Sequence, residues 1–357
     1  MHHLFSELGR QFRLPGTLSS YEEIQTGNIN RTYRVRFRTD NGAESSYIFQ
    51  KINTSVFEHP AEIMENIGRV TAHIREKCPG QPYLHFHSAD TGKNYAVRDH
   101  EFWRAADWID SVTFDSCEDP NVIRAVGEAF GGFQTLLSDF DGSVLHETIP
   151  GFHDTRQRLD RLFADARRNS AGRTPDVQTE LYRLRLYYKE ACVLSDRYRR
   201  GEFPIRVTHN DTKANNVLFD RETLHPLTVI DLDTVMPGMA MIDFGDAVRF
   251  LANTAAEDEP DLSKVSLDEE KFAAFADGFL GQVRGALTPA EIASMVRGVF
   301  TVTAELAARF LDDYINGDVY FKVNYPEHNL IRARCQLHLA EDIFAKAERL
   351  EKKIRNG

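Results

Sequence analysis

A short segment carries residue types whose spacing suits phosphoryl transfer: Asp211, Lys213, Asn216 and, after the next apolar stretch, Asp231. An Asp can accept a proton from a hydroxyl nucleophile, and a Lys two residues later can steady the transferring phosphate. An amide oxygen and a carboxylate are ligands that Mg²⁺ accepts. We therefore predict that Asp211 is the general base, that Lys213 assists it, and that Asn216 and Asp231 hold the metal.

A second candidate metal ligand stands downstream in Asp243-Phe244-Gly245, which spells the metal-binding tripeptide of protein kinases. It lies far beyond Asp211, and Pro237-Gly238 separates it from the stretch that ends at Asp231. We interpret Asp243 as a helix N-cap that also braces the catalytic loop.

The region before these motifs predicts an antiparallel sheet with one helix. Alternating apolar residues indicate strands at 32–37 and 47–52, with a second pair at 95–98 and 102–104. Apolar residues at helical spacing indicate a helix that begins at Pro60, a favoured first helical residue. This order of strands and helix is the layout of the small lobe of a protein-kinase-like fold.

Beyond about residue 110, apolar residues recur mostly at helical spacing. We therefore predict an α+β, bilobal, protein-kinase-like fold. Its N-terminal nucleotide-binding lobe would span residues 1–108, with an antiparallel sheet and one helix. Its larger, mainly helical catalytic and substrate-binding lobe would span residues 109–357.

The amino-acid composition limits the kinds of partner that the protein can bind. The 357 residues carry a net charge of −11, which argues against a nucleic acid or an anionic membrane as partner. No apolar run approaches the roughly 18 residues of a membrane span. The four cysteines are scattered, and the first residues lack the features of a signal peptide. We expect a cytoplasmic protein; the oligomeric state is left open.

The predicted small lobe should bind ATP. The stretch 27–33 lies where a loop over the phosphates belongs, although it has one Gly and an ordinary turn is an equal alternative. Lys51, late in the second strand, could reach the phosphates and pair with a Glu of the following helix, with Glu65 preferred to Glu62. The backbone of the stretch 102–109 would read adenine. The predicted ATP-binding residues are Asn28, Asn30, Thr32, Lys51, Glu65, Asp107 and Ile109.

These motifs resemble the aminoglycoside phosphotransferase family of small-molecule kinases, through His209-x-Asp211-x-x-x-x-Asn216 and Ile230-Asp231-x-Asp233. Within it, the chain is similar to the N-acetylhexosamine 1-kinases over nearly its whole length. The segments that carry this likeness are 27–33, 49–53, 147–155, 209–217, 230–238 and 309–321.

The resemblance implies an ATP- and Mg²⁺-dependent reaction. Its acceptor would be the anomeric hydroxyl of N-acetylglucosamine or N-acetylgalactosamine, and its product the sugar 1-phosphate. The implied sugar contacts are Phe152, His153, Asp154, Arg309, Asp312 and Tyr320. An equal alternative is that Phe152 and Tyr320 are core residues and that Arg309 pairs with a carboxylate.

Two other functions stay open. The first is a kinase of the same family that acts on another small alcohol or amine, such as choline, homoserine or a glycated amine. The second is a non-catalytic nucleotide-binding regulator. The joint presence of Asp211, Asn216, Asp231 and Lys51 argues against the regulator.

Overall fold

The computed structural model describes residues 1–25, 29–80 and 82–356. The chain divides into two compact units. The first comprises Met1–Val112, Val144–Thr148 and Leu218–Met236, and the second comprises Thr113–Ser143, Ile149–Val217 and Pro237–Gly357. The sequence suggested one boundary, after residue 108, whereas two later segments return to the first unit.

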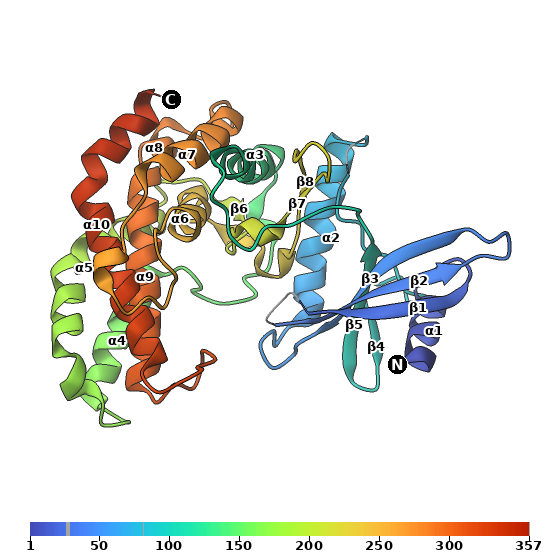
Figure 1. Cartoon of the computed structure of the whole chain (residues 1–357), viewed down its shortest axis with the longest axis horizontal. Helices are drawn as coiled ribbons and strands as arrows, with labels where there is room; N and C mark the ends of the chain where they lie inside the picture. Colours follow the sequence, from blue (N-terminus) through green and yellow to red (C-terminus); the bar gives the residue numbers. More distant parts are fainter. Residues whose placement is uncertain (26–28, 81, 357) are drawn as a thin grey trace. The chain divides into compact units, whose positions relative to one another are not determined.

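The first unit is built on a five-stranded sheet with the order β1-β2-β3-β5-β4, in which all neighbours are antiparallel (Figure 1). The strands and helix predicted from apolar periodicity are all present. The main elements are α1 (His2–Gln11), β1 (Thr17–Ile24), β2 (Arg31–Arg38), β3 (Glu44–Ile52), α2 (Pro60–Lys77), β4 (Ala96–Arg98), β5 (Glu101–Asp107), β8 (Pro226–Val229) and η4 (Leu232–Thr234).

The sequence analysis missed α1 and β1. Helix α1 and its C-cap residue place Phe5, Leu8 and Phe12 against one face of the sheet, where they join the hydrophobic core around Phe49 and Trp103. Strand β1 is an edge strand without a fully buried residue, so it lacks the alternating apolar signal that marks β2 and β3.

The second unit is mainly helical. Asp119 caps α3 by accepting a hydrogen bond from the Asn121 N–H, as the Asp-Pro-Asn sequence suggests. The elements of the second unit are α3 (Pro120–Leu136), η1 (Gly142–Val144, whose last residue belongs to the first unit), α4 (Thr155–Arg168), η2 (Thr174–Val177), α5 (Gln178–Arg199), β6 (Arg206–Thr208), η3 (Ala214–Asn216), α6 (Ala240–Leu251), η5 (Leu262–Lys264), α7 (Glu269–Val283), α8 (Pro289–Ile292), α9 (Met295–Ile315) and α10 (His328–Asn356). Strands β7 (Val217–Phe219) and β9 (Met236–Gly238) run across the unit boundaries.

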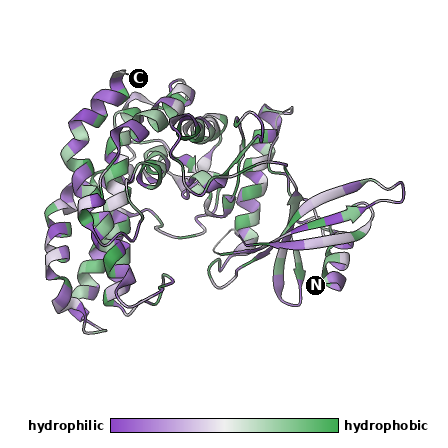
Figure 2. Ribbon diagram, viewed as in Figure 1, coloured by the Kyte–Doolittle hydropathy of each residue, from purple (hydrophilic) through white to green (hydrophobic). Residues whose placement is uncertain are grey.

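Helices α6 and α9 form the buried centre of this unit, since nearly every residue of α6 is buried. Hydrophilic and hydrophobic residues alternate along α5 and α10 (Figure 2), as expected for helices with one face in solvent.

A five-stranded antiparallel sheet in the N-terminal part, followed by a mainly helical part, confirms the predicted fold class. Among the described residues, none of the helices combines the length and the apolar character needed to cross a membrane.

Candidate active site

The candidate catalytic loop follows the buried strand β6 and ends in η3. Asn210 turns the chain with a φ of 63°, a left-handed conformation that Asn tolerates. The Asp211 carboxylate accepts a hydrogen bond of 3.2 Å from the Asn216 amide and lies 2.7 Å from the Lys213 ammonium. The side chains of Asp211 and Lys213 are about one third exposed (29% and 36%). The predicted catalytic residues are therefore brought together within one unit.

Asp243 braces this loop. Its carboxylate accepts hydrogen bonds from the backbone N–H groups of His209 and Asn210, each 2.8 Å long, and from the Gln134 amide. Helix α6 begins at Ala240 after Met239, so the predicted N-cap role is wrong and Asp243 lies within the first turn. The bracing role is confirmed, because the carboxylate satisfies two donors of the loop backbone.

Asp246, one turn further along α6, holds the next part of the loop. It accepts a hydrogen bond of 3.1 Å from the Thr212 N–H and pairs with Arg249 at 2.8 Å. Burial alone would raise the pKa of Asp246, but the Arg249 guanidinium lowers it below its usual value. Burial would likewise lower the pKa of Lys213, but the carboxylates of Asp211 and Asp246 raise it. Asp246 is therefore a charged partner for Arg249 beside the loop, whereas burial raises the pKa of Asp243.

The Asp-Phe-Gly triplet has a structural explanation at each position. Asp243 braces the loop, and Phe244 is fully buried against the rings of Phe275 and Phe279. A Cβ atom on Gly245 would lie 2.5 Å from the Gly298 backbone of α9, so only Gly permits this approach of the two helices.

The two predicted metal ligands lie in different units. The Asn216 amide group donates to the Asp211 carboxylate and carbonyl oxygen, which leaves the amide oxygen able to act as a ligand. Asp231 is exposed and has a φ of 60° where β8 gives way to η4. An amide oxygen and a carboxylate suit Mg²⁺. That they share one ion stays a prediction.

A buried ion pair in the first unit anchors the segment after Asp231. Asp233 pairs with Arg104 of β5, and their side chains are only 3% and 2% exposed. Asn30 donates to the other Asp233 oxygen at 2.6 Å, and Gln50 accepts from Arg104 at 2.8 Å. The Asp233 carboxylate of η4 therefore connects Asn30, just before β2, with Arg104 of β5.

Two of the predicted phosphate-binding residues, Asn30 and Thr32, form hydrogen bonds with other residues of the first unit. Asn30 uses both ends of its amide, because its oxygen accepts from the Asn53 N–H at 2.9 Å. Thr32 accepts from the Gln50 amide at 3.1 Å. Asn28 lies outside the described residues. The ATP contacts of all three stay predictions.

The predicted pairing of Lys51 with Glu65 is wrong. The Lys51 ammonium pairs with Glu101, at the start of β5, and Glu65 lies 2.8 Å from His146. Side chains alternate along a strand, so Lys51 shares the α1 face of the sheet with Phe49, whereas Gln50 faces Arg104 on the other side. The sequence analysis placed Lys51 in the right strand but gave it the wrong carboxylate partner.

The other two predicted nucleotide-binding residues are Asp107, the last residue of β5, and Ile109, two residues later. The Asp107 carboxylate lies between His85 and His87, 2.8 Å from a ring nitrogen of each. The Ile109 carbonyl accepts from the Ser111 hydroxyl at 2.9 Å. Their role in reading adenine would use the backbone and stays a prediction.

Two of the predicted acceptor residues, His153 and Arg309, interact with a buried acid that the sequence analysis missed. His153 donates or accepts through Nδ1 at 2.9 Å from Glu305, a 1% exposed carboxylate on α9 that also accepts from Thr155. Burial would raise the pKa of Glu305, but His153 and Arg309 lower it. The signal was a single Glu within the apolar stretch 299–308. The His153 Nε2 atom is buried and has no hydrogen-bond partner among the described residues.

Arg309 does not pair with a carboxylate among the described residues. Its guanidinium instead lies over the rings of Phe152 and Phe321, 5.1 and 5.6 Å from their centroids. Arg158 is close enough that Arg309 lowers its pKa further, although burial is the larger cause. The alternative in which Arg309 pairs with a carboxylate is therefore wrong for the part of the chain that the structure describes.

The remaining acceptor candidates differ in their burial and in their neighbours. Asp154 caps α4 and pairs with Arg199, so its carboxylate has structural partners that account for it without a bound sugar. Tyr320 is 66% exposed, so it is not a core residue. Burial, with the neighbouring Asp165, raises the pKa of Asp312 to about 6.

The loop, the antiparallel sheet and the helical second unit define a phosphotransferase with a protein-kinase-like fold. The chain belongs to the phosphotransferase enzyme family, whose sequence profile matches residues 20–277. The family predicted from the motifs is thus confirmed.

Three solved structures share this fold over nearly their whole length. A microcompartment-associated aminopropanol kinase has a TM-score of 0.63 at 16% identity, covering 97% of this chain and 98% of that chain. Choline kinase from Cryptosporidium parvum Iowa II has a TM-score of 0.57 at 11% identity, covering 97% and 96%. A spectinomycin phosphotransferase in complex with ADP and spectinomycin has a TM-score of 0.56 at 12% identity, covering 98% and 99%.

Proposed function

We propose that this phosphotransferase is a kinase that transfers the γ-phosphoryl group of ATP to the anomeric hydroxyl of an N-acetylhexosamine. The observation that carries the chemistry is the Asp211 carboxylate, held between Lys213 and Asn216 and partly open to solvent. As the anomeric oxygen bonds to the γ-phosphorus, its proton passes to Asp211 and ADP leaves.

Lys213 and the metal site would handle the phosphate charge. The Lys213 ammonium is fixed beside Asp211, where it can also face a transferring phosphoryl group. Asn216 and Asp231 would hold Mg²⁺, which neutralises charge on the nucleotide phosphates when bound.

Arg158 and Arg309 favour a neutral sugar over a cationic amine as acceptor. Arg309 lies over two aromatic rings and forms no ion pair with a carboxylate among the described residues; Arg158 lies near it, and the buried Glu305 carboxylate acts electrostatically on both guanidinium groups. Such a pair repels an ammonium group and can donate hydrogen bonds to hydroxyl or acetamido oxygens. His153, which interacts electrostatically with Asp243 and Asp246 beside the loop, has a buried nitrogen available for the same purpose.

The test is an ATP-consumption assay with Mg²⁺ over N-acetylglucosamine, N-acetylgalactosamine, unacetylated hexoses, choline, ethanolamine and homoserine. We expect turnover with an N-acetylhexosamine, and phosphorus NMR should place the phosphate on the anomeric carbon. Turnover of choline or ethanolamine with no turnover of any sugar would overturn the acceptor assignment and support the amino-alcohol alternative.

If the protein is instead a regulator without catalytic activity, ATP consumption will stay at background with every compound of this panel. Cytoplasmic location and the absence of nucleic-acid or membrane partners remain part of this proposal. The net charge of −11 supports the absence of nucleic-acid and anionic-membrane partners.

A further inference from the structure

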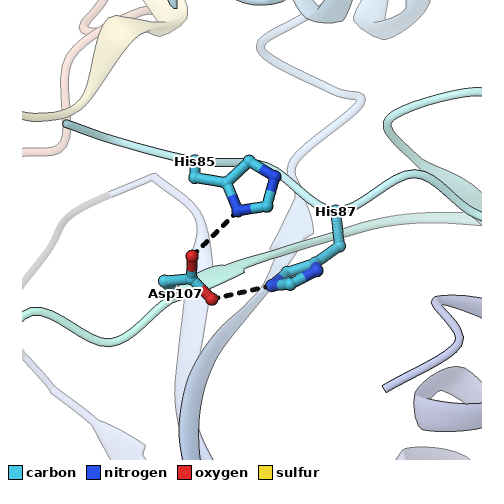
Figure 3. A group of neighbouring side chains, drawn as sticks. All are labelled: His85, His87 and Asp107. Carbon is cyan, nitrogen blue, oxygen red and sulfur yellow. Dashed lines mark hydrogen bonds and ion pairs between the residues drawn. The ribbon is translucent and has the colours of Figure 1, made fainter. Parts of the chain in front are cut away.

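Two histidines and one aspartate come together in the first unit, on the sheet at the end of β5 (Figure 3). The segment that holds His85 and His87 pairs with β5, because the His87 N–H donates to the Ala105 carbonyl and the Asp107 N–H donates to the His85 carbonyl. Residues two apart on an extended chain face the same side. Both imidazole rings therefore point at the Asp107 carboxylate of the neighbouring strand.

The three groups lie close enough for side-chain movements to bring them around one metal ion. His85 Nδ1 and His87 Nε2 each lie 2.8 Å from a different Asp107 oxygen, and the three ligand atoms lie within 4.8 Å of one another. Zinc binds nitrogen and oxygen ligands at about 2.0–2.2 Å, which places two ligands of one ion roughly 3 Å apart. The limit of 4.8 Å on the separations exceeds this spacing, so rotation of the partly exposed His85 and Asp107 side chains would bring the ligands around the ion.

Charge and access favour a cation at this position. The Asp107 carboxylate faces the two ring nitrogens and can supply a negative charge to a cation bound among them. The side chains of Asp107 and His85 are 46% and 38% exposed, whereas His87 is 20% exposed. The Tyr47 ring contacts the edge of the His87 ring at 5.3 Å and helps to fix its orientation.

We propose that His85, His87 and Asp107 form a binding site for one divalent cation of the zinc class, with water completing the coordination. Imidazole nitrogens suit zinc and poorly suit Mg²⁺, so this site is chemically distinct from the proposed Mg²⁺ ligands Asn216 and Asp231. Bound metal would tie the 85–87 segment to the strand end that precedes Trp108 and Ile109.

The test uses full-length protein without an affinity tag, treated with a chelator and then freed of it. Zinc is titrated in competition with a chromophoric chelator, with Mg²⁺ in large excess. We expect one zinc ion per chain. We also expect His87→Ala and Asp107→Asn to weaken binding at least about tenfold, because each removes a direct ligand. Cobalt in place of zinc should give visible absorption bands that these variants lose.

Two control variants define the site. His146→Ala removes a histidine that also lies 2.8 Å from a carboxylate, that of Glu65, but has no third ligand in the described part of the chain. A His2→Ala, His3→Ala variant removes the N-terminal histidines. Both should bind zinc like the unaltered protein.

Folding of every variant is checked by circular dichroism, and added zinc should raise the thermal midpoint only where the three ligands are intact. The proposal is overturned if the unaltered protein binds no zinc under these conditions. It is also overturned if folded His87→Ala and Asp107→Asn proteins bind zinc as tightly as the unaltered protein. In that case the three residues form only a hydrogen-bonded clamp.

Discussion

The candidate base depends on its own loop for position and on α6 for rigidity. Lys213 and Asn216 contact the Asp211 carboxylate, while Asp243 and Asp246 hold the surrounding backbone. Positioning contributes much of the rate in phosphoryl transfer, so the bracing residues matter alongside the base itself.

Replacing Asp211 with Asn should lower kcat by about 10²- to 10⁴-fold, since the amide cannot accept the acceptor's proton. The substitution is nearly isosteric, so thermal stability and ATP affinity, measured by calorimetry, should change little. Turnover equal to that of the unaltered enzyme would refute the role of Asp211 as base.

Asp312 should make stability depend on pH. Its pKa is raised to about 6 by burial and by Asp165. Between about pH 4 and 6 the folded protein therefore retains a proton that the unfolded chain releases, and the free energy of unfolding falls as pH rises. Asp312→Asn should raise that free energy near neutral pH by up to about 3 kcal/mol.

The pH dependence supplies its own control. Near pH 4, where the Asp312 carboxyl is protonated in the folded protein, the variant and the unaltered protein should unfold at similar urea concentrations. Parallel stability profiles from pH 4 to pH 8 would contradict the raised pKa.

At the scale of elements, the Arg104–Asp233 pair connects β5 to η4, next to the proposed metal ligand Asp231. Arg104→Met should lower the free energy of unfolding by about 3–5 kcal/mol, because it leaves the Asp233 charge buried without its partner. Adding Asp233→Asn should recover part of that loss in a double-mutant cycle.

An exposed ion pair provides the comparison. Arg124 and Asp277 are 50% and 42% exposed, so Arg124→Met should cost less than about 1 kcal/mol. Equal losses in the Arg104 and Arg124 variants, measured by urea unfolding, would show that the buried pair has no special role.

The contact between α6 and α9 depends on Gly245. Gly245→Ala should lower the free energy of unfolding by about 1–3 kcal/mol, because the new methyl group would meet the Gly298 backbone. The matched control is Gly281→Ala in α7, where a Cβ atom meets nothing within 4 Å. That change should be neutral or stabilising by up to about 1 kcal/mol. Thermal unfolding of both variants distinguishes steric overlap from helix propensity.

At the scale of the whole molecule, the proposed reaction joins residues of both units, since Asp211 and Asn216 belong to one and Asp231 to the other. Removing divalent cations with EDTA should stop turnover, and excess Mg²⁺ alone should restore it. The readout is ADP formation with the preferred acceptor. Undiminished turnover in EDTA would exclude Asn216 and Asp231 as essential metal ligands.

The sequence by itself determined the family, the main strands of the sheet, and the loop that holds Asp211, Lys213 and Asn216. These depend on local spacing, and neighbours in the chain remain neighbours in the fold. It did not determine β1, because an edge strand buries too little for periodicity to mark it.

Only the tertiary structure decided the partners of charged side chains. Lys51 pairs with Glu101 and not Glu65, Asp233 with Arg104, and His153 with Glu305. Each contact joins residues at least 50 positions apart. Strand register and helix packing, which arise from the whole core, choose among many possible carboxylates. The same register brought His85 and His87 to Asp107, a grouping that no local motif had indicated.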